Sequence, residues 1–325
     1  MYLDRCRLLG IAVAVFSSTS QFAFGQSFPS RTITIIVPYP AGGPTDLIAR
    51  TLGERVRQPL GQSVIVENVT GAGGTIGVGR ATRATPDGHT LLIGNNGSNV
   101  LNAALYSLPF DIMNDLAPVA RLTTNPQIII SKSAIPAKSL VELIAWLKQN
   151  QANVSVGIAG PIAHVNVINF QNSTSTRFKI VPYRGANLAM QDLVGGHIEL
   201  MLDQLSNALS QVRAGTVKAY AVAAPKRSPS APDVPTVDEA GLPGLHGSLW
   251  HGLWVPKSTP QDIIATIASA IKQALADPVV RQKLGEAGQE VVSVDQQIPA
   301  ALAGYQTAEA ERWLPLVKAA NLKGD

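Results

Sequence analysis

The sequence has little of what many enzyme and nucleic-acid sites are built from. Its single cysteine is Cys6, so no disulfide, thiol nucleophile or cysteine-bound metal is expected in the rest of the chain. The 26 basic and 22 acidic residues are scattered and give a net charge of only +4. No basic run indicates a nucleic-acid partner. Beyond the N-terminal segment, no apolar run approaches the roughly 20 residues of a transmembrane helix.

Patterns for catalysis and cofactor binding are also missing. The chain has no Gly-x-Ser-x-Gly motif, no evident pair of catalytic carboxylates, and no His/Asp/Glu spacing typical of a metal site. We therefore predict neither an enzyme nor a bound metal or cofactor. What remains is a chain of 325 residues, 46% of them hydrophobic and 15% charged, as in a globular α/β protein. This length allows two domains.

Residues 1–25 have the pattern of a secretory signal peptide. Arg5 and Arg7 precede a short apolar core, Leu8 to Phe16, and Ala23-Phe24-Gly25 places small residues at the cleavage positions. We expect cleavage before Gln26 and a periplasmic mature protein. An N-terminal membrane anchor is the alternative, but the apolar core is short for a spanning helix.

A loop rich in glycine and proline joins the first expected strand to the first expected helix. The β-branched run Ile33–Val37 predicts a buried parallel strand, and Leu47–Leu52 has helical spacing, with Thr45 or Asp46 as the expected N-cap. Between them lies Pro38-Tyr39-Pro40-Ala41-Gly42-Gly43-Pro44. Its glycines let a ligand approach the backbone, and the helix start offers N–H groups to an anion such as a carboxylate. An ordinary strand-to-helix turn without a ligand is the alternative.

Two more strands with polar loops follow. Residues 62–68 and 91–94 read as strands. The loop Gly71-Ala72-Gly73-Gly74-Thr75-Ile76-Gly77 does not match GxGxxG and follows the second strand, which disfavours a dinucleotide site. The third strand ends at Asn95-Asn96-Gly97-Ser98. The alternation predicts a doubly wound domain, in which ligands gather at the carboxyl ends of the strands.

A second unit of the same kind is expected after a crossing between residues 119 and 131. Ser139 and Glu142 form a capping box for a helix over residues 139–149. A strand at 154–158 leads through Gly160-Pro161-Ile162-Ala163-His164 into another helix. Further strands are predicted at 180–185, 198–202 and 217–224, with helices at 188–194 and 205–214. Residues 225–247 form a surface connection, residues 249–256 return to the first domain, and the chain is expected to be helical from Pro260 onward.

This organisation predicts a domain of residues 26–127 and 251–325 and a domain of residues 128–250. Two βα domains joined by two crossings form a hinged pair that closes around small solutes.

At this point the ordered motifs resemble one family, the substrate-binding proteins of tripartite tricarboxylate transporters, also called Bug-type extracytoplasmic solute receptors. The matching stretches span nearly the whole mature chain: residues 36–46, 66–68 with 71–74, 86–92, 181–185, 195–201, 224–228 and 232–237. The resemblance implies a two-lobed, Venus-flytrap fold of the type II periplasmic-binding-protein class. It also implies a ligand carboxylate held through backbone N–H groups and water, and a membrane permease as partner. We expect the protein to be a monomer.

Candidate ligand-binding residues are carried over by position from the same resemblance. In the first domain they are Tyr39, Ala41, Gly42, Gly43, Thr45, Asp46, Gly73, Gly74, Asn95 and Ser98. In the second domain they are Gly160, Pro161, His164, Tyr183 and Asp203.

The sequence departs from the family pattern at two places. Relatives usually have Gly-Thr-Pro-Ser-His where this chain has Gly160-Pro161-Ile162-Ala163-His164, so two hydroxyl groups are missing. Pro44 stands where many relatives have glycine and removes a backbone donor. We therefore expect an apolar or aromatic carboxylate, which leaves fewer polar groups unpaired in such a site.

Several alternatives stay open on the sequence alone. His164 is either a ligand contact or a structural histidine, Asp203 a ligand contact or a helix N-cap, and Trp250 and Trp254 hinge or core residues or a stacking platform. The function favoured by the motifs is capture of a small organic acid and its delivery to a permease. A receptor that signals its closed form to a membrane sensor, and a hydrolase, are the alternatives.

Overall fold

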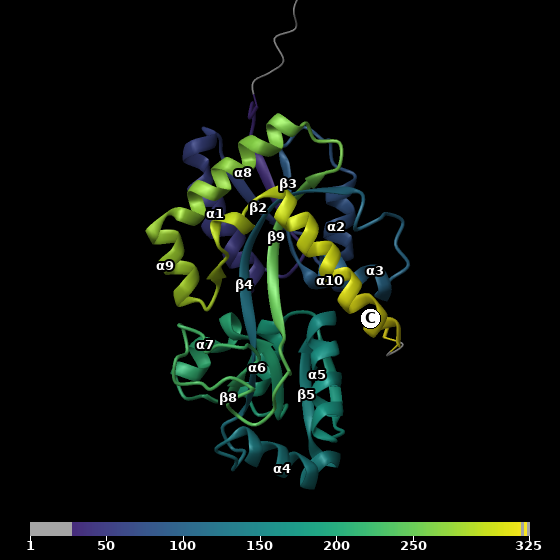
Figure 1. The fold of residues 1–325 in the computed structure, drawn as a ribbon, viewed down its shortest axis with the longest axis vertical. Helices are drawn as coiled ribbons and strands as arrows, with labels where there is room; N and C mark the ends of the chain where they lie inside the picture. The colour runs from purple at the N-terminus through teal and green to yellow at the C-terminus, as the bar shows by residue number, and fades with distance from the viewer. Residues whose placement is uncertain (1–27, 320–321, 324–325) are drawn as a thin grey trace, which may run out of the picture.

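The computed structural model describes residues 28–319 and 322–323, in two lobes that lie one above the other (Figure 1). We call the lobe that contains the first strand the first lobe and the other the second lobe. The expected signal peptide, with Cys6 and the cleavage site before Gln26, lies outside the described residues.

The first lobe is built on three parallel strands whose order places the first strand in the middle. Strand β1 (Ile33–Val37) pairs with β2 (Val64–Asn68) on one side and with β3 (Thr90–Asn95) on the other. The antiparallel strand β9 (Ser248–Pro256) continues the sheet beyond β3. Because β1 is covered on both faces, its residues are nearly all buried apolar side chains, as the sequence predicts.

The second lobe repeats this order. Strand β5 (Ser155–Ala159) lies between the parallel strands β6 (Lys179–Tyr183) and β7 (Leu200–Gln204). The antiparallel strand that extends the sheet is β4 (Leu116–Lys132), which also pairs with β8 (Val217–Val222). The carboxyl ends of the three parallel strands of each lobe carry the loops that the sequence singled out.

Strand β4 is common to both sheets. Its residues from Leu116 to Pro126 pair with β9, and those from Gln127 to Ser131 pair with β7. Figure 1 shows β4 and β9 running side by side from one lobe into the other. The two crossings expected near Pro126 and Trp250 are therefore strands of a continuous sheet and not loops.

Helices cover both faces of each sheet and close four clusters of buried apolar side chains. The first lobe has α1 (Pro44–Leu60), α2 (Thr75–Thr82), α3 (Asn102–Leu105), α8 (Gln261–Ala276), α9 (Pro278–Glu286) and α10 (Pro299–Ala319). The second lobe has α4 (Leu140–Asn150), α5 (Pro161–Thr174), α6 (Ala186–Val194) and α7 (Leu205–Arg213). The short helices η1 to η4 and the two-residue strand β10 (Glu290–Val291) complete the fold.

Two local predictions were wrong. The N-cap of α1 is Gly43, not Thr45 or Asp46, because Pro44 occupies the first helical position, for which its fixed φ and missing N–H are suited. The segment after Pro260 is not helical throughout, since β10 pairs with β4 between α9 and α10. By contrast, Ser139 is confirmed as an N-cap, accepting a hydrogen bond from the Glu142 nitrogen at 3.2 Å.

Within the described ranges, no individual helix combines the length and apolar character of a membrane span. Helices α8 and α9 pass that test only as a pair, bent by 71° at their junction.

Candidate functional site

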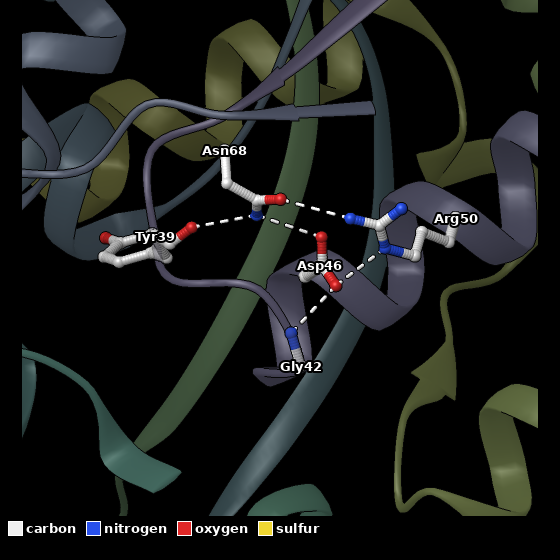
Figure 2. A network of polar contacts seen from close by, with 5 residues as sticks. All are labelled: Tyr39, Gly42, Asp46, Arg50 and Asn68. Atoms are coloured by element: carbon white, nitrogen blue, oxygen red, sulfur yellow. Dashed lines mark hydrogen bonds and ion pairs between the residues drawn. The ribbon is translucent and has the colours of Figure 1, made fainter. Parts of the chain in front are cut away.

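The loop between β1 and α1 is held by a carboxylate of the protein itself. The Asp46 carboxylate accepts hydrogen bonds from the Gly42 nitrogen at 2.9 Å and from Arg50 Nε at 2.9 Å. Asn68, at the end of β2, donates to Asp46 Oδ1 at 2.9 Å and to the Tyr39 carbonyl at 3.0 Å. Figure 2 shows Asp46 at the centre of this network. We call these five residues the Asp46 lock.

The Asp46 lock fixes the charge and the shape of the loop. Burial alone would raise the pKa of Asp46, but the hydrogen bonds from Arg50, Gly42 and Asn68 lower it below its usual value. Asp46 is therefore a buried anion of the scaffold, and the Gly42 N–H already has an acceptor. Gly42 has a φ of +81°, with open space where a Cβ would stand. The glycine is required by its backbone conformation, and the space beside it is free.

The three loops at the carboxyl ends of the first-lobe strands meet. Tyr39 donates its hydroxyl to Asn95 Oδ1 at 2.8 Å, which ties the first loop to the third. A Cβ placed on Gly74 would lie 3.3 Å from the Pro38 carbonyl and 3.4 Å from Ser98 Cβ, so the second loop packs between the other two. Asn95 and Ser98 form a turn of their own, in which Asn95 Oδ1 accepts from the Gly97 and Ser98 nitrogens. Seven candidates of the first lobe are thereby brought together: Tyr39, Gly42, Gly43, Asp46, Gly74, Asn95 and Ser98.

A buried histidine links the start of α1 to the crossing strands. His251 on β9 lies 3.2 Å from Thr45 Oγ1 through Nε2 and 3.2 Å from Thr123 Oγ1 through Nδ1. Thr123 donates in turn to Gln289 Oε1 at 3.0 Å. Because the Thr123 proton goes to Gln289, Thr123 accepts from His251 Nδ1–H, and Thr45 donates to Nε2. Burial lowers the pKa of His251 to about 3, so the imidazole is neutral and can fill both roles.

The second-lobe candidates lie at the corresponding strand ends, but the side chains of Tyr183 and Asp203 have partners within their own lobe. Gly160 precedes α5, and Tyr183 at the end of β6 donates its hydroxyl to Asp192 of α6 at 2.6 Å. Asp203 accepts from the Gln204 nitrogen at 2.7 Å and from Asn207. The N-cap of α7 is Gln204, so Asp203 is not the cap residue. Burial raises the pKa of Asp203 to about 7.

The lobes touch at two kinds of contact. A Cβ placed on Gly185 would lie 3.2 Å from Pro40 Cγ, so the loop after β6 meets the loop after β1. On the apolar side, Ile162 and Val165 of α5 join a cluster of first-lobe side chains that includes Trp250. Ile162, in the turn that lacks the family's hydroxyls, is therefore buried against the other lobe.

Burial decides between the alternative roles of the two tryptophans, Trp250 and Trp254. Trp250 and Trp254 have no exposed surface and pack 6.0 Å apart between ring centroids, and their indole nitrogens donate to Glu309 and Gln306 of α10. They are core residues and not a stacking platform. His164 has interactions within the structure, which leaves both of its sequence-based interpretations open.

Sequence reasoning missed the residues that support the loops. Arg50, Asn68, Thr123, His251 and Gln289 were not singled out as site residues. One signal was present: His251 is a polar residue in the apolar run from Leu249 to Val255. The others become neighbours only when distant segments fold together.

A hollow of about 250 Å³ lies elsewhere, between α1 and α8, and is lined by Arg55, Gln58, Pro59, Gln273 and Ala274. It is at the far end of α1 from the loops and contains none of the candidate residues. In the part of the chain that the structure describes, no group of three or more His, Cys, Asp or Glu side chains is arranged to hold a metal ion.

Comparison with known proteins finds one family model and several solved structures that match most of this chain. Residues 48–322 match the model of the tripartite tricarboxylate transporter family receptor. MatC from Rhodopseudomonas palustris, solved with bound malate, is 38% identical, with a TM-score of 0.84 over 89% of this chain and all of that one. The periplasmic binding protein BugD is 35% identical, with a TM-score of 0.85 over 91% of this chain and 99% of its own. Rpa4515 from R. palustris, solved with adipate, is 28% identical, with a TM-score of 0.86 over 91% and 99% of the two chains.

Proposed function

The chain belongs to the tripartite tricarboxylate transporter receptor family, and from this premise we propose that it captures a small organic acid in the periplasm and delivers it to a membrane permease of that transporter type. Its fold is that of the periplasmic solute-binding proteins. Structural neighbours with malate and with adipate support a small carboxylate as the ligand. The permease is the partner that the family description implies.

The observation that carries the proposal is the convergence of three strand-end loops around the start of α1. Tyr39 contacts Asn95, and Gly74 packs against Pro38 and Ser98, so the loops form one preorganised surface. A helix N-terminus in such a place favours an anion without needing a positively charged side chain. Because the Gly42 N–H already binds Asp46, we propose that the remaining backbone N–H groups of residues 41–45 receive the ligand carboxylate.

Ligand capture is proposed to close the two lobes. We keep the division into residues 26–127 with 251–325 and residues 128–250, with the bend in the crossing strands β4 and β9. In this scheme Gly160, His164, Tyr183 and Asp203 approach the ligand from the second lobe. A closed form is the state that the permease would recognise.

The proposal is tested first by a thermal-shift screen of carboxylic acids, because a ligand that binds only the folded state raises its apparent stability. Calorimetric titration then compares two variants. Arg184→Ala should leave the affinity within about threefold, since the site does not depend on this exposed arginine. Gly42→Val should abolish binding, because valine is strained at this φ and its side chain would fill the free space beside the loop.

Circular dichroism first establishes that both variants are folded. Loss of binding in Arg184→Ala together with normal binding in Gly42→Val would show a salt-bridge site and would contradict the placement of the carboxylate. If no acid in the screen stabilised the protein, the proposed function would be wrong.

A further inference from the structure

A turn of the first lobe reaches the second lobe beside the crossing strands. It consists of residues 285–290, from the end of α9 to the start of β10. The Gly285 carbonyl accepts a hydrogen bond from Ser230 Oγ at 2.7 Å, and Glu290 Oε1 accepts one from Ser228 Oγ at 3.1 Å. Both serines belong to the second-lobe connection that follows β8. These hydrogen bonds therefore join the lobes without involving the crossing strands themselves.

Helix α7 of the second lobe contacts the same turn at both of its ends. Arg213, its last residue, donates to the Glu286 carbonyl at 3.4 Å. A Cβ placed on Gly288 would lie 3.1 Å from the Ser206 nitrogen, near the start of the helix. The turn thus packs closely on α7. We call the hydrogen bonds that the two serines and Arg213 donate to this turn the interlobe clasp.

Each side of the interlobe clasp is fixed within its own lobe. In the first lobe, Glu290 pairs with Thr124 on β4. In the second lobe, Arg213 also donates to the Ser230 carbonyl at 3.0 Å, so the clasp donors hold one another in place. Because neither side can follow the other freely, the clasp has to stretch or break when the lobes rotate apart.

The interlobe clasp is connected to the start of α1 by the buried hydrogen bonds of His251. Gln289, within the turn, accepts from Thr123 Oγ1 at 3.0 Å, and Thr123 accepts in turn from His251. The other nitrogen of His251 accepts from Thr45, in the first turn of α1. One continuous network therefore sets the position of the turn relative to the loop that is proposed to receive the ligand carboxylate.

Resting on the proposed function above, we propose that the interlobe clasp is a conformational device that holds the two lobes together before the ligand arrives, and that the His251 network fixes it relative to the ligand-binding end of α1. Hydrogen bonds that can be exchanged for water are individually weak, so the clasp biases an equilibrium and does not lock the lobes. The ligand then meets a receptor whose closed arrangement is already populated, and its apparent affinity rises with that population.

Spin labels on two introduced cysteines test the interlobe clasp without any ligand. Cys6 is the single cysteine, so Lys272→Cys on α8 and Ser210→Cys on α7, both exposed, are the only labelled sites of the mature protein. Pulsed electron paramagnetic resonance gives the distribution of distances between the labels, and hence between the lobes. Adding Arg213→Ala and Ser230→Ala together should raise the long-distance population about threefold or more, because two hydrogen bonds of the clasp are lost.

Matched substitutions separate the clasp from general effects. Arg177→Ala with Ser173→Ala is the control, because both residues are exposed and Arg177 donates to Asn172 within the second lobe. It should keep the distance distribution of the parent. Thr123→Val removes the hydroxyl that donates to Gln289 and should raise the long-distance population, whereas Thr123→Ser keeps the hydroxyl and should not.

Combining Thr123→Val with the two clasp substitutions should open the lobes little further than the clasp substitutions alone, since residues of one network do not act additively. Circular dichroism establishes that every variant is folded. An unchanged distribution in the clasp variant would refute the clasp, and strict additivity with Thr123→Val would refute its connection to α1. No ligand enters these measurements, so their outcome is independent of the acid screen that decides the proposed function.

Discussion

At the scale of single residues, the buried polar side chains of the site form hydrogen bonds with other residues of the protein. Asp46, His251 and Asp203 are all buried, yet each has a different reason for its charge state. Asp46 is an anion because three donors surround it, His251 is neutral because it is buried, and Asp203 is on the border of ionisation at neutral pH. Only the last of these is open to change under physiological conditions.

The Asp46 lock should be a measurable part of stability. Asp46→Asn replaces the buried anion with a neutral amide and leaves Arg50 without its ion-pair partner. We expect a loss of about 1–3 kcal/mol in the free energy of unfolding, measured by urea denaturation. Asp262→Asn is the control, because Asp262 is likewise in the first turn of a helix but exposed. Equal losses in the two variants would mean that the lock contributes nothing of its own.

Asp203 should make stability depend on pH. Its folded-state pKa of about 7 lies above the unfolded value of about 3.9, so unfolding releases a proton between these values. Stability contributed by the neutral carboxyl is therefore lost as pH rises through the folded pKa. Relative to wild type, Asp203→Asn should gain stability on the order of 4 kcal/mol between about pH 4 and about pH 8. Thermal melts at several pH values check this, and a constant difference would contradict it.

At the scale of elements, the sequence predicted most strands, but it gave the segments of β4 and β9 only as crossings between the domains. Ile33–Val37 is confirmed to the residue, because a buried parallel strand requires a continuous apolar run and few other structures do. The sequence also pointed to the loops after these strands. It did not predict β10, whose two residues carry no periodic signal, or the N-cap of α1, where proline outweighed the usual preference for a hydroxyl or carboxylate.

Local sequence patterns could not predict which distant residues form hydrogen bonds with the strand-end loops. Thr45 and His251 are 206 positions apart, and Asn68 reaches Asp46 across 22 positions. Each of these contacts depends on strand register, which is set by pairing between distant segments. A polar residue at a strand end indicates a site, but its partner is known only after folding.

The turn after β3 should tolerate no side chain at Gly94. A Cβ there would overlap Asn99 Oδ1, whose amide lies fully buried in the helix that follows. Gly94→Ala should lower the free energy of unfolding by about 1–3 kcal/mol and disturb the Asn95–Ser98 turn. Gly304→Ala on α10 is the matched substitution, since a Cβ there meets nothing within 4 Å. It should stabilise the protein by about 0.5–1 kcal/mol, as a helical glycine replaced by alanine does.

Chemical denaturation of the two glycine variants measures both effects. Stabilisation by both substitutions would show that the overlap at Gly94 is relieved without cost, and destabilisation by both would contradict the expectation for Gly304.

At the scale of the whole molecule, the two lobes should move closer on ligand binding. Solution scattering with a confirmed ligand at saturation should give a smaller radius of gyration than without it, because closure brings the strand-end loops together. Gly42→Val, measured at the same ligand concentration, supplies the control. An unchanged radius for the wild-type protein would argue against hinge closure.

The position of β9 between β3 and β4 also affects how the chain folds. Asn95 pairs with His251, and Leu116 pairs with Pro256, so the first sheet lacks a strand until the chain is complete past residue 256. Contacts between such distant residues carry a high entropic cost of loop closure and slow the folding reaction. We therefore expect a nascent chain that ends before Ser248 to lack a stable first lobe. Late folding of this kind leaves the polypeptide unfolded for longer, and a translocation channel can pass an unfolded chain.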